Sequence, residues 1–147
     1  MKFRVVFFIL AISIAFFLFL RDLFESMQIE DEYFSSLNLV LKGVVQDVDR
    51  PESSNGFGIL EVSILNSNLD NYDPRNTREY YYCIIKNGKA EIYQCAVSQI
   101  QVGDTVEINT RKKGFKLLRN DSTFEEPLLL YDKPQLFNYA KKYHQRF

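Results

Sequence analysis

The amino-acid sequence predicts a mainly β protein with an N-terminal transmembrane helix, a small, partly open β-barrel of five or six strands, and a C-terminal helix. Three observations predict this fold. Residues 5–20 are uncharged and almost wholly apolar, short alternating apolar stretches fill the middle of the chain, and a helical apolar stripe lies near its end. The 147 residues suffice for one small domain beyond the apolar segment.

The apolar run from Val5 to Leu20 contains a single polar residue, Ser13. As a helix it would be about 24 Å long, close to the ~30 Å of a hydrocarbon core, and flanking arginines can extend to the headgroups. Two other interpretations are a cleaved signal peptide and a buried soluble helix. The only small-x-small triplet, Ser13-Ile14-Ala15, lies inside the run. We therefore predict an uncleaved anchor at residues 1–20.

Charge around this segment predicts its orientation. Lys2 and Arg4 precede the run, Arg21 follows it, and residues 22–32 are acidic. The positive-inside rule then places the N-terminus in the cytoplasm and the domain outside. The predicted location is the cytoplasmic (inner) membrane, crossed once by residues 5–20. Residues 21–36 form either a helical stalk or an acidic linker.

The segment from residue 37 onward alternates as strands do. Gly43 separates two apolar phases within the first strand, which indicates either a β-bulge or a sharp coil of the strand. Residues 58–65 form the next strand, with Leu60, Val62 and Ile64 facing inward. Asn87-Gly88 joins two apolar stretches and predicts a two-residue hairpin turn. In that register Cys83 lies opposite Ile92, so it points away from Cys95 and two small buried side chains are favoured over a disulfide.

The last third of the chain is predicted to contain a turn at Val102-Gly103-Asp104, two strands at 105–110 and 115–118, a loop at 120–126 and a helix at 133–146. The Gly-bent first strand LKGVVQDV, the Asn-Gly hairpin and the Val-Gly-Asp turn resemble OB-type barrels. They resemble more narrowly the small single-pass bacterial envelope proteins that carry such a barrel, mostly of unassigned function. The resemblance covers roughly residues 37–119. It implies an OB-like fold and an envelope location, and it supplies no catalytic residues. With the C-terminal helix, the predicted OB-like domain spans residues 37–147.

Catalytic chemistry finds little support. His144 is the only histidine and lies among cations, while Cys83 and Cys95 lack the spacing of redox or zinc motifs. The loop Asn66-x-Asn68-x-Asp70-Asn71 lacks the Asp at the first position, the Gly at the sixth and the bidentate Glu at the twelfth that a calcium loop requires. The sequence therefore predicts no catalytic residue, cofactor or metal site. A small enzyme of unknown reaction ranks third, after the two binding hypotheses given below.

Three groups of residues are candidates for contact with partners. The chain beyond the anchor contains 16 of the 18 basic residues and all 19 acidic residues. Its net charge is therefore negative, which disfavours binding to nucleic acid. The polar loop at residues 66–79 and the tyrosines of the Asn87-Gly88 hairpin are candidates for contact with an envelope protein or a glycan. The basic hairpin that follows the strand at 105–110 either keeps the sheet edge soluble or contacts anionic headgroups. The loop and tyrosine residues are Asp70, Asp73, Arg75, Tyr80, Tyr82 and Tyr93; the basic residues are Arg111, Lys112, Lys113 and Lys116.

We therefore predict a membrane-tethered, non-catalytic binding or assembly module that meets another envelope protein. The alternative is an envelope glycan-binding barrel, in which an exposed tyrosine face stacks on sugar rings.

Overall fold

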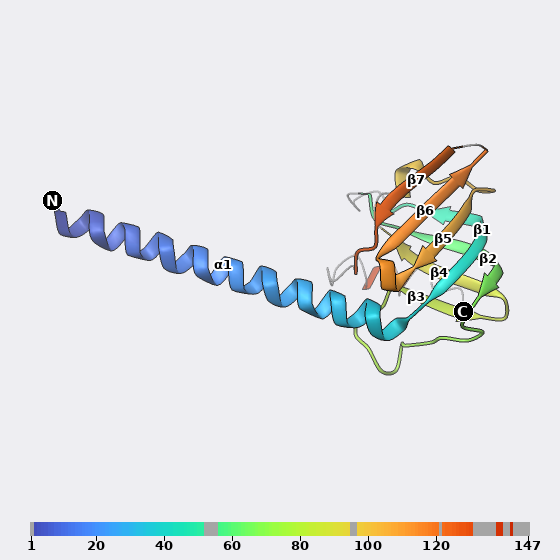
Figure 1. Ribbon diagram of the computed structural model, residues 1–147, viewed down its shortest axis with the longest axis horizontal. Coiled ribbons are helices and arrows are strands. Elements are labelled where there is room, and N and C mark those ends of the chain that lie inside the picture. The colour runs from blue at the N-terminus through green and yellow to red at the C-terminus, as the bar shows by residue number, and fades with distance from the viewer. Residues whose placement is uncertain are drawn as a thin grey trace. The chain divides into compact units, whose positions relative to one another are not determined.

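The computed structural model describes residues 2–51, 56–94, 97–120, 122–130, 138, 139 and 142, with side chains from residue 8 onward. The chain divides into two compact units, Met1–Ser36 and Leu37–Phe147. The first is helical and the second contains a β-sheet (Figure 1).

The helix α1 spans Lys2–Leu37. Its sequence contains neither glycine nor proline, so nothing in it interrupts the backbone hydrogen bonds of a helix. It ends where Asn38 adopts a left-handed conformation with φ of 46°, a geometry that commonly terminates helices. Helical structure therefore continues through residues 21–36, the segment for which a stalk and a linker were both considered.

The predicted transmembrane anchor at residues 5–20 is contradicted, and so is the single-pass inner-membrane location that depended on it. Within the part of the chain that the structure describes, no helix combines the length and the sustained apolar character needed to cross a bilayer. Beyond Leu20 the helix carries the charged residues Arg21, Asp22 and Glu25, so its apolar character does not continue in that direction.

The second unit contains one antiparallel sheet of seven strands in the order β3-β4-β2-β1-β5-β6-β7. This corrects the predicted OB-like barrel of five or six strands: the sheet is open, with β3 and β7 as its end strands (Figure 1). Tyr72 lies along the outer edge of β3 and exchanges two backbone hydrogen bonds with Ile85, of 2.9 and 2.8 Å. The strands are β1 (Val40–Asp49), β2 (Gly58–Ser67), β3 (Cys83–Lys86), β4 (Lys89–Gln94), β5 (Thr105–Asn109), β6 (Gly114–Arg119) and β7 (Ser122–Pro127).

The additional strand is β7, which occupies a segment predicted to be a loop. It has little apolar character, and most of its side chains are exposed. Its pairing with β6, which places Glu125 opposite Lys116, makes it a strand. Tertiary pairing thus decides the conformation of a segment whose own sequence favours none.

The bulge predicted at Gly43 is confirmed. The register of β1 against β2 shifts between Lys42 and Gly43, and the backbones approach closely there. A Cβ atom at Gly43 would lie 2.4 Å from Val62 Cγ1 and 2.6 Å from the backbone oxygen of Ser63. Only glycine fits this position without moving a neighbouring strand.

The Asn87-Gly88 hairpin is also confirmed. Both residues have positive φ, 54° and 74°, as a type I′ turn requires, and Lys86 pairs with Lys89 across it. Cys83 pairs with Ile92 as predicted and is buried, whereas Cys95 lies outside the described residues.

Apolar side chains from alternate positions of the strands form the core. Leu60 and Val62 are buried as predicted, but Ile64 is half-exposed because β2 leaves the core towards its end. Further buried side chains include Leu41, Val45, Ile85, Ala90, Ile92, Val106, Ile108, Phe115 and Leu117.

The predicted Val102-Gly103-Asp104 turn is present and is held by an ion pair. Gly103 has a φ of 92°, and the Asp104 carboxylate accepts from the Gln101 backbone N–H at 2.7 Å. Arg119 donates to both Asp104 oxygens, at 2.7 and 2.6 Å. Its guanidinium holds the pKa of the Asp104 carboxyl below the usual range.

The predicted C-terminal helix at 133–146 is not among the elements that the structure describes, which corrects this part of the predicted fold. Most of that segment, His144 included, lies outside the described residues. The positions within it that the structure describes are Asn138, Tyr139 and Lys142, and each of them has helical backbone.

Candidate functional site

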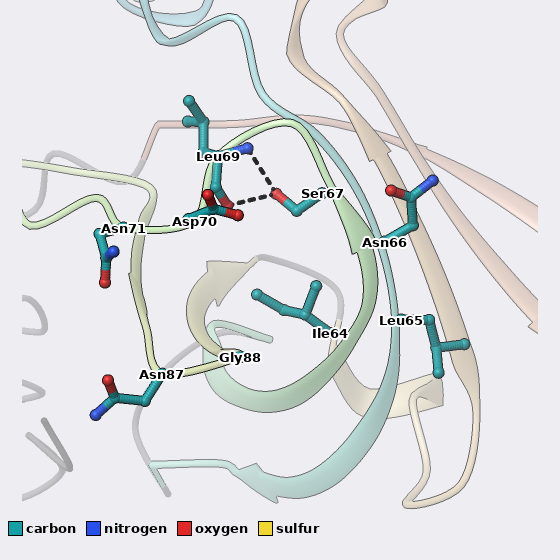
Figure 2. A pocket seen from close by; sticks show the side chains of 9 residues that line it. All are labelled: Ile64, Leu65, Asn66, Ser67, Leu69, Asp70, Asn71, Asn87 and Gly88. Carbon is teal, nitrogen blue, oxygen red and sulfur yellow. Dashed lines mark hydrogen bonds between the residues drawn. The ribbon is translucent and has the colours of Figure 1, made fainter.

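A pocket of about 470 Å³ lies at the end of β2, next to the β3–β4 hairpin turn. Figure 2 shows Ile64 in its middle, between the loop at residues 69–71 and the turn at Asn87 and Gly88. The Ile64 N–H donates to the Gly88 carbonyl at 2.9 Å and holds the turn against β2. Ser67 Oγ accepts from the Leu69 N–H at 3.1 Å and donates to the Leu69 carbonyl at 2.9 Å, which fixes the loop.

The pocket combines an aliphatic surface with amide groups and one carboxylate. Its volume falls within the range of small-ligand and peptide-side-chain sites. Each carboxamide offers two N–H donors and a carbonyl acceptor, which matches the donor and acceptor of a peptide group. The lining residues are Ile64, Leu65, Asn66, Ser67, Leu69, Asp70, Asn71, Asn87 and Gly88.

A second hollow, which we call the groove, has a volume of about 480 Å³ and lies across β2, β1, β5 and β6. Asn68 fixes its rim: its Oδ1 accepts from the Val40 N–H, and its Nδ2 donates to the Asn38 carbonyl, both at 2.7 Å. The groove is lined by Val40, Leu41, Lys42, Asn66, Ser67, Asn68, Glu107, Ile108, Asn109, Lys112, Gly114 and Lys116.

Charged side chains of alternating sign run across the sheet beside the groove. Successive strand pairs place Lys42 opposite Glu107, Glu107 opposite Lys116, and Lys116 opposite Glu125. Lys42 Nζ lies 2.8 Å from Glu107 Oε1, and Lys116 forms an ion pair with Glu125. Three lysines and one glutamate line the groove itself, so its lining is net positive.

Asn66 and Ser67 line both the pocket and the groove, so the two hollows adjoin at the end of β2. Neither residue was predicted to be part of a site. A ligand that lies across Asn66 and Ser67 would therefore contact both hollows.

The structure divides the predicted basic residues. Lys112 and Lys116 line the groove, whereas Arg111 and Lys113 are exposed beside it and are not among its lining residues. Lys113 has a left-handed backbone with φ of 47° and ends the short 3₁₀ turn η2 (Thr110–Lys112). Lys42 and Glu107 are additional charged lining residues, which alternation within their strands did not single out.

The structure also separates the predicted loop residues. Asp70 lines the pocket, but Asp73 and Arg75 form a two-pronged ion pair with each other. The Arg75 guanidinium holds the pKa of the Asp73 carboxyl below its usual range. Of these three residues, Asp70 alone is therefore placed to contact a ligand in the pocket.

The tyrosines that the alternative glycan hypothesis places on an exposed face are mostly internal. Tyr82 and Tyr93 are buried and Tyr80 is half-buried. Tyr82 Oη donates to Gln94 Oε1 at 2.8 Å, and Tyr93 Oη donates to the buried carboxylate of Glu91. Burial, with the nearby charge of Glu91, raises the pKa of Tyr93 far above its ordinary value. The rings of Tyr81 and Tyr93 meet edge to face, with centroids 5.3 Å apart. Tyr82 and Tyr93 thus pack the interior and do not offer a surface for stacking.

The described side chains offer little for catalysis. Burial raises the pKa of the Cys83 thiol far above neutrality, which disfavours the nucleophilic thiolate. Among the described residues, no group of three or more histidine, cysteine, aspartate or glutamate side chains is placed to hold a metal ion. The pocket and the groove present amide, charged and aliphatic groups to a ligand.

Comparison with known proteins finds no family model, no curated protein and no solved structure that matches this chain.

Proposed function

We propose that this chain is a non-catalytic binding module whose ligand is an extended segment of a partner protein. The observation that carries the proposal is the adjacency of the pocket and the groove, which share Asn66 and Ser67. A peptide segment crossing these two residues would place successive side chains in the two hollows.

The chemistry of the lining supports a peptide ligand. Asn66, Asn71 and Asn87 bear carboxamides that can pair with peptide N–H and C=O groups. Leu65 is 63% exposed and Val40 is 48% exposed, and such apolar surface gains free energy when a partner covers it.

A glycan ligand has weaker support. Sugar rings commonly stack on exposed aromatic side chains, and none of the described residues that line the two hollows is aromatic. Tyr82 and Tyr93, the residues on which a glycan hypothesis was based, are buried.

Site-specific photocrosslinking tests the proposal. A benzoyl-phenylalanine is placed at Leu65 of the full chain, and at Val102 as a matched control, because the two side chains are equally exposed, at 63% and 64%. Irradiation of the cells in which the protein is native is expected to give a discrete protein adduct from position 65 but not from position 102.

Two further measurements decide whether the adduct reports this site. Mass spectrometry should map the crosslink to one contiguous segment of the partner, and Asn71→Trp, which fills the pocket, should abolish the adduct. Identical adducts from positions 65 and 102, or an adduct that persists with Asn71→Trp, would overturn the proposal.

A further inference from the structure

The charged groups around the two hollows differ in whether they already have ionic partners. In the groove, Lys42 is neutralised by Glu107 at 2.8 Å, and Lys116 is neutralised by Glu125. Both lysines therefore have a carboxylate before any ligand arrives. Replacing such a contact with one to a ligand gains little free energy.

Lys112 is the lining cation of the groove that makes no ion pair within the described residues. Its backbone is held in place, because its N–H donates to Asn109 Oδ1 at 3.2 Å at the start of η2. Its side chain is exposed. Of the three lysines among the described residues that line the groove, Lys112 thus presents to a ligand an ammonium group that is not already in an ion pair, and its backbone is fixed.

Asp70 plays the corresponding part in the pocket. Arg75 lies five residues further along the chain, but its guanidinium is engaged by Asp73. In the described part of the chain Asp70 has no ion pair, and none of the residues that line the pocket is cationic. The pocket therefore presents one unneutralised carboxylate.

We infer that the partner segment is dipolar, with a basic side chain that faces Asp70 in the pocket and an acidic side chain that faces Lys112 in the groove. This inference rests on the proposed function and specifies the ligand of the same site. Asn66 and Ser67 line both the hollow that contains Asp70 and the hollow that contains Lys112. The neutral part of the segment crosses them.

Two opposite charges at the two ends of a site determine the direction of the bound chain. A segment bound in the reverse direction would set its base against Lys112 and its acid against Asp70, and both contacts would be repulsive. Exposed ion pairs add modest affinity, but they contribute strongly to specificity and to the rate of association. The geometry therefore predicts a ligand with a fixed order of charges.

Selection of peptides tests this inference. A library of random dodecapeptides displayed on phage is selected against the immobilised full chain, and bound peptides are sequenced. The expected result is enrichment of peptides with one basic and one acidic position in a constant order. Binding of a selected synthetic peptide should weaken on the order of fivefold to tenfold with Asp70→Lys or Lys112→Glu, and the loss should shrink at high salt.

Charge reversal identifies which end of the peptide meets which residue. Asp70→Lys should bind best the peptide whose base is replaced by an acid, and Lys112→Glu should bind best the peptide whose acid is replaced by a base. Arg111→Glu, a neighbouring exposed cation that does not line the groove, is the matched control and should change binding less than twofold.

The outcomes separate this inference from the proposed function. Enriched peptides that Asn71→Trp displaces, but that carry no paired charges or bind equally to the Asp70→Lys and Lys112→Glu variants, overturn the dipolar segment alone. Failure to enrich any peptide that Asn71→Trp displaces overturns the proposed function as well.

Discussion

Gly43 offers a sharp test of the fold, because its neighbours leave no room for a side chain. In Gly43→Ala the new methyl group would lie 2.4 Å from Val62 Cγ1 and 2.6 Å from Ser63 O. Ordinary contacts begin near 3.4 Å, so each neighbour must move by about 1 Å. Val62 can rotate, but the Ser63 oxygen belongs to the backbone of β2.

The cost follows from these distances. Overpacking of this kind lowers the free energy of unfolding by about 1–3 kcal/mol. Part of this loss, about 0.4–1 kcal/mol, is offset because alanine reduces the conformational entropy of the unfolded chain. Both contacts are shorter than 3.0 Å, so we take the upper end of the overpacking range and expect Gly43→Ala to lower the free energy of unfolding by about 2 kcal/mol. Urea denaturation followed by tyrosine emission measures it, since the chain contains no tryptophan.

Two other glycines serve as matched controls. Gly88 has open space around it but a φ of 74°, so Gly88→Ala should cost roughly 1 kcal/mol through backbone strain alone. At Gly114 the nearest atom is 3.9 Å away and φ is ordinary, so Gly114→Ala should change stability by less than about 0.5 kcal/mol. If Gly43→Ala costs no more than Gly114→Ala, the close approach of β1 and β2 described above is wrong.

Two further predictions concern ionisable groups. Arg119 lowers the pKa of the Asp104 carboxyl. The ion pair therefore stabilises the fold fully at pH values above the ordinary carboxyl pKa of about 4, and this stabilisation is lost as the pH falls through the lowered pKa. Asp104→Asn should therefore lower the free energy of unfolding at pH 7, and the loss should become progressively smaller below pH 4, as thermal melts at several pH values would reveal. A pH-independent difference would contradict this account. Because burial raises the pKa of the Cys83 thiol, iodoacetamide should label Cys83 only after denaturation, as peptide mass spectrometry would show. Labelling of the native protein at the rate of a free thiol would show that Cys83 is accessible.

Local sequence signals predicted the features that depend on one or two residues. Gly43 indicated the bulge and Asn87-Gly88 indicated the hairpin register, because each conformation has steric requirements that few residues meet. β7 was missed because its conformation comes from pairing with β6, which local composition does not record. The number of strands, and whether the sheet closes, depend on such long-range pairings.

The candidate site was predicted only in part for a similar reason. Asp70, Lys112 and Lys116 were identified from their polarity and charge, but Asn66 was not, because its position between two hollows follows from the packing of four strands. Alternation also placed Tyr82 and Tyr93 on a common face without showing that this face is covered. The polar residues that end β2, Asn66 to Asn68, were the one local signal that could have located the site.

The two ends of the open sheet differ in a way that affects self-association. At β3 the backbone of Tyr72 already occupies hydrogen-bonding positions at Ile85, so another chain cannot extend the sheet there without displacing it. At β7 the edge carries Glu125 and Glu126 and ends in Pro127, and charge and proline both oppose pairing with a second strand. The β unit therefore resists edge-to-edge aggregation at both ends by two different means, one a covering segment and the other the composition of the strand itself.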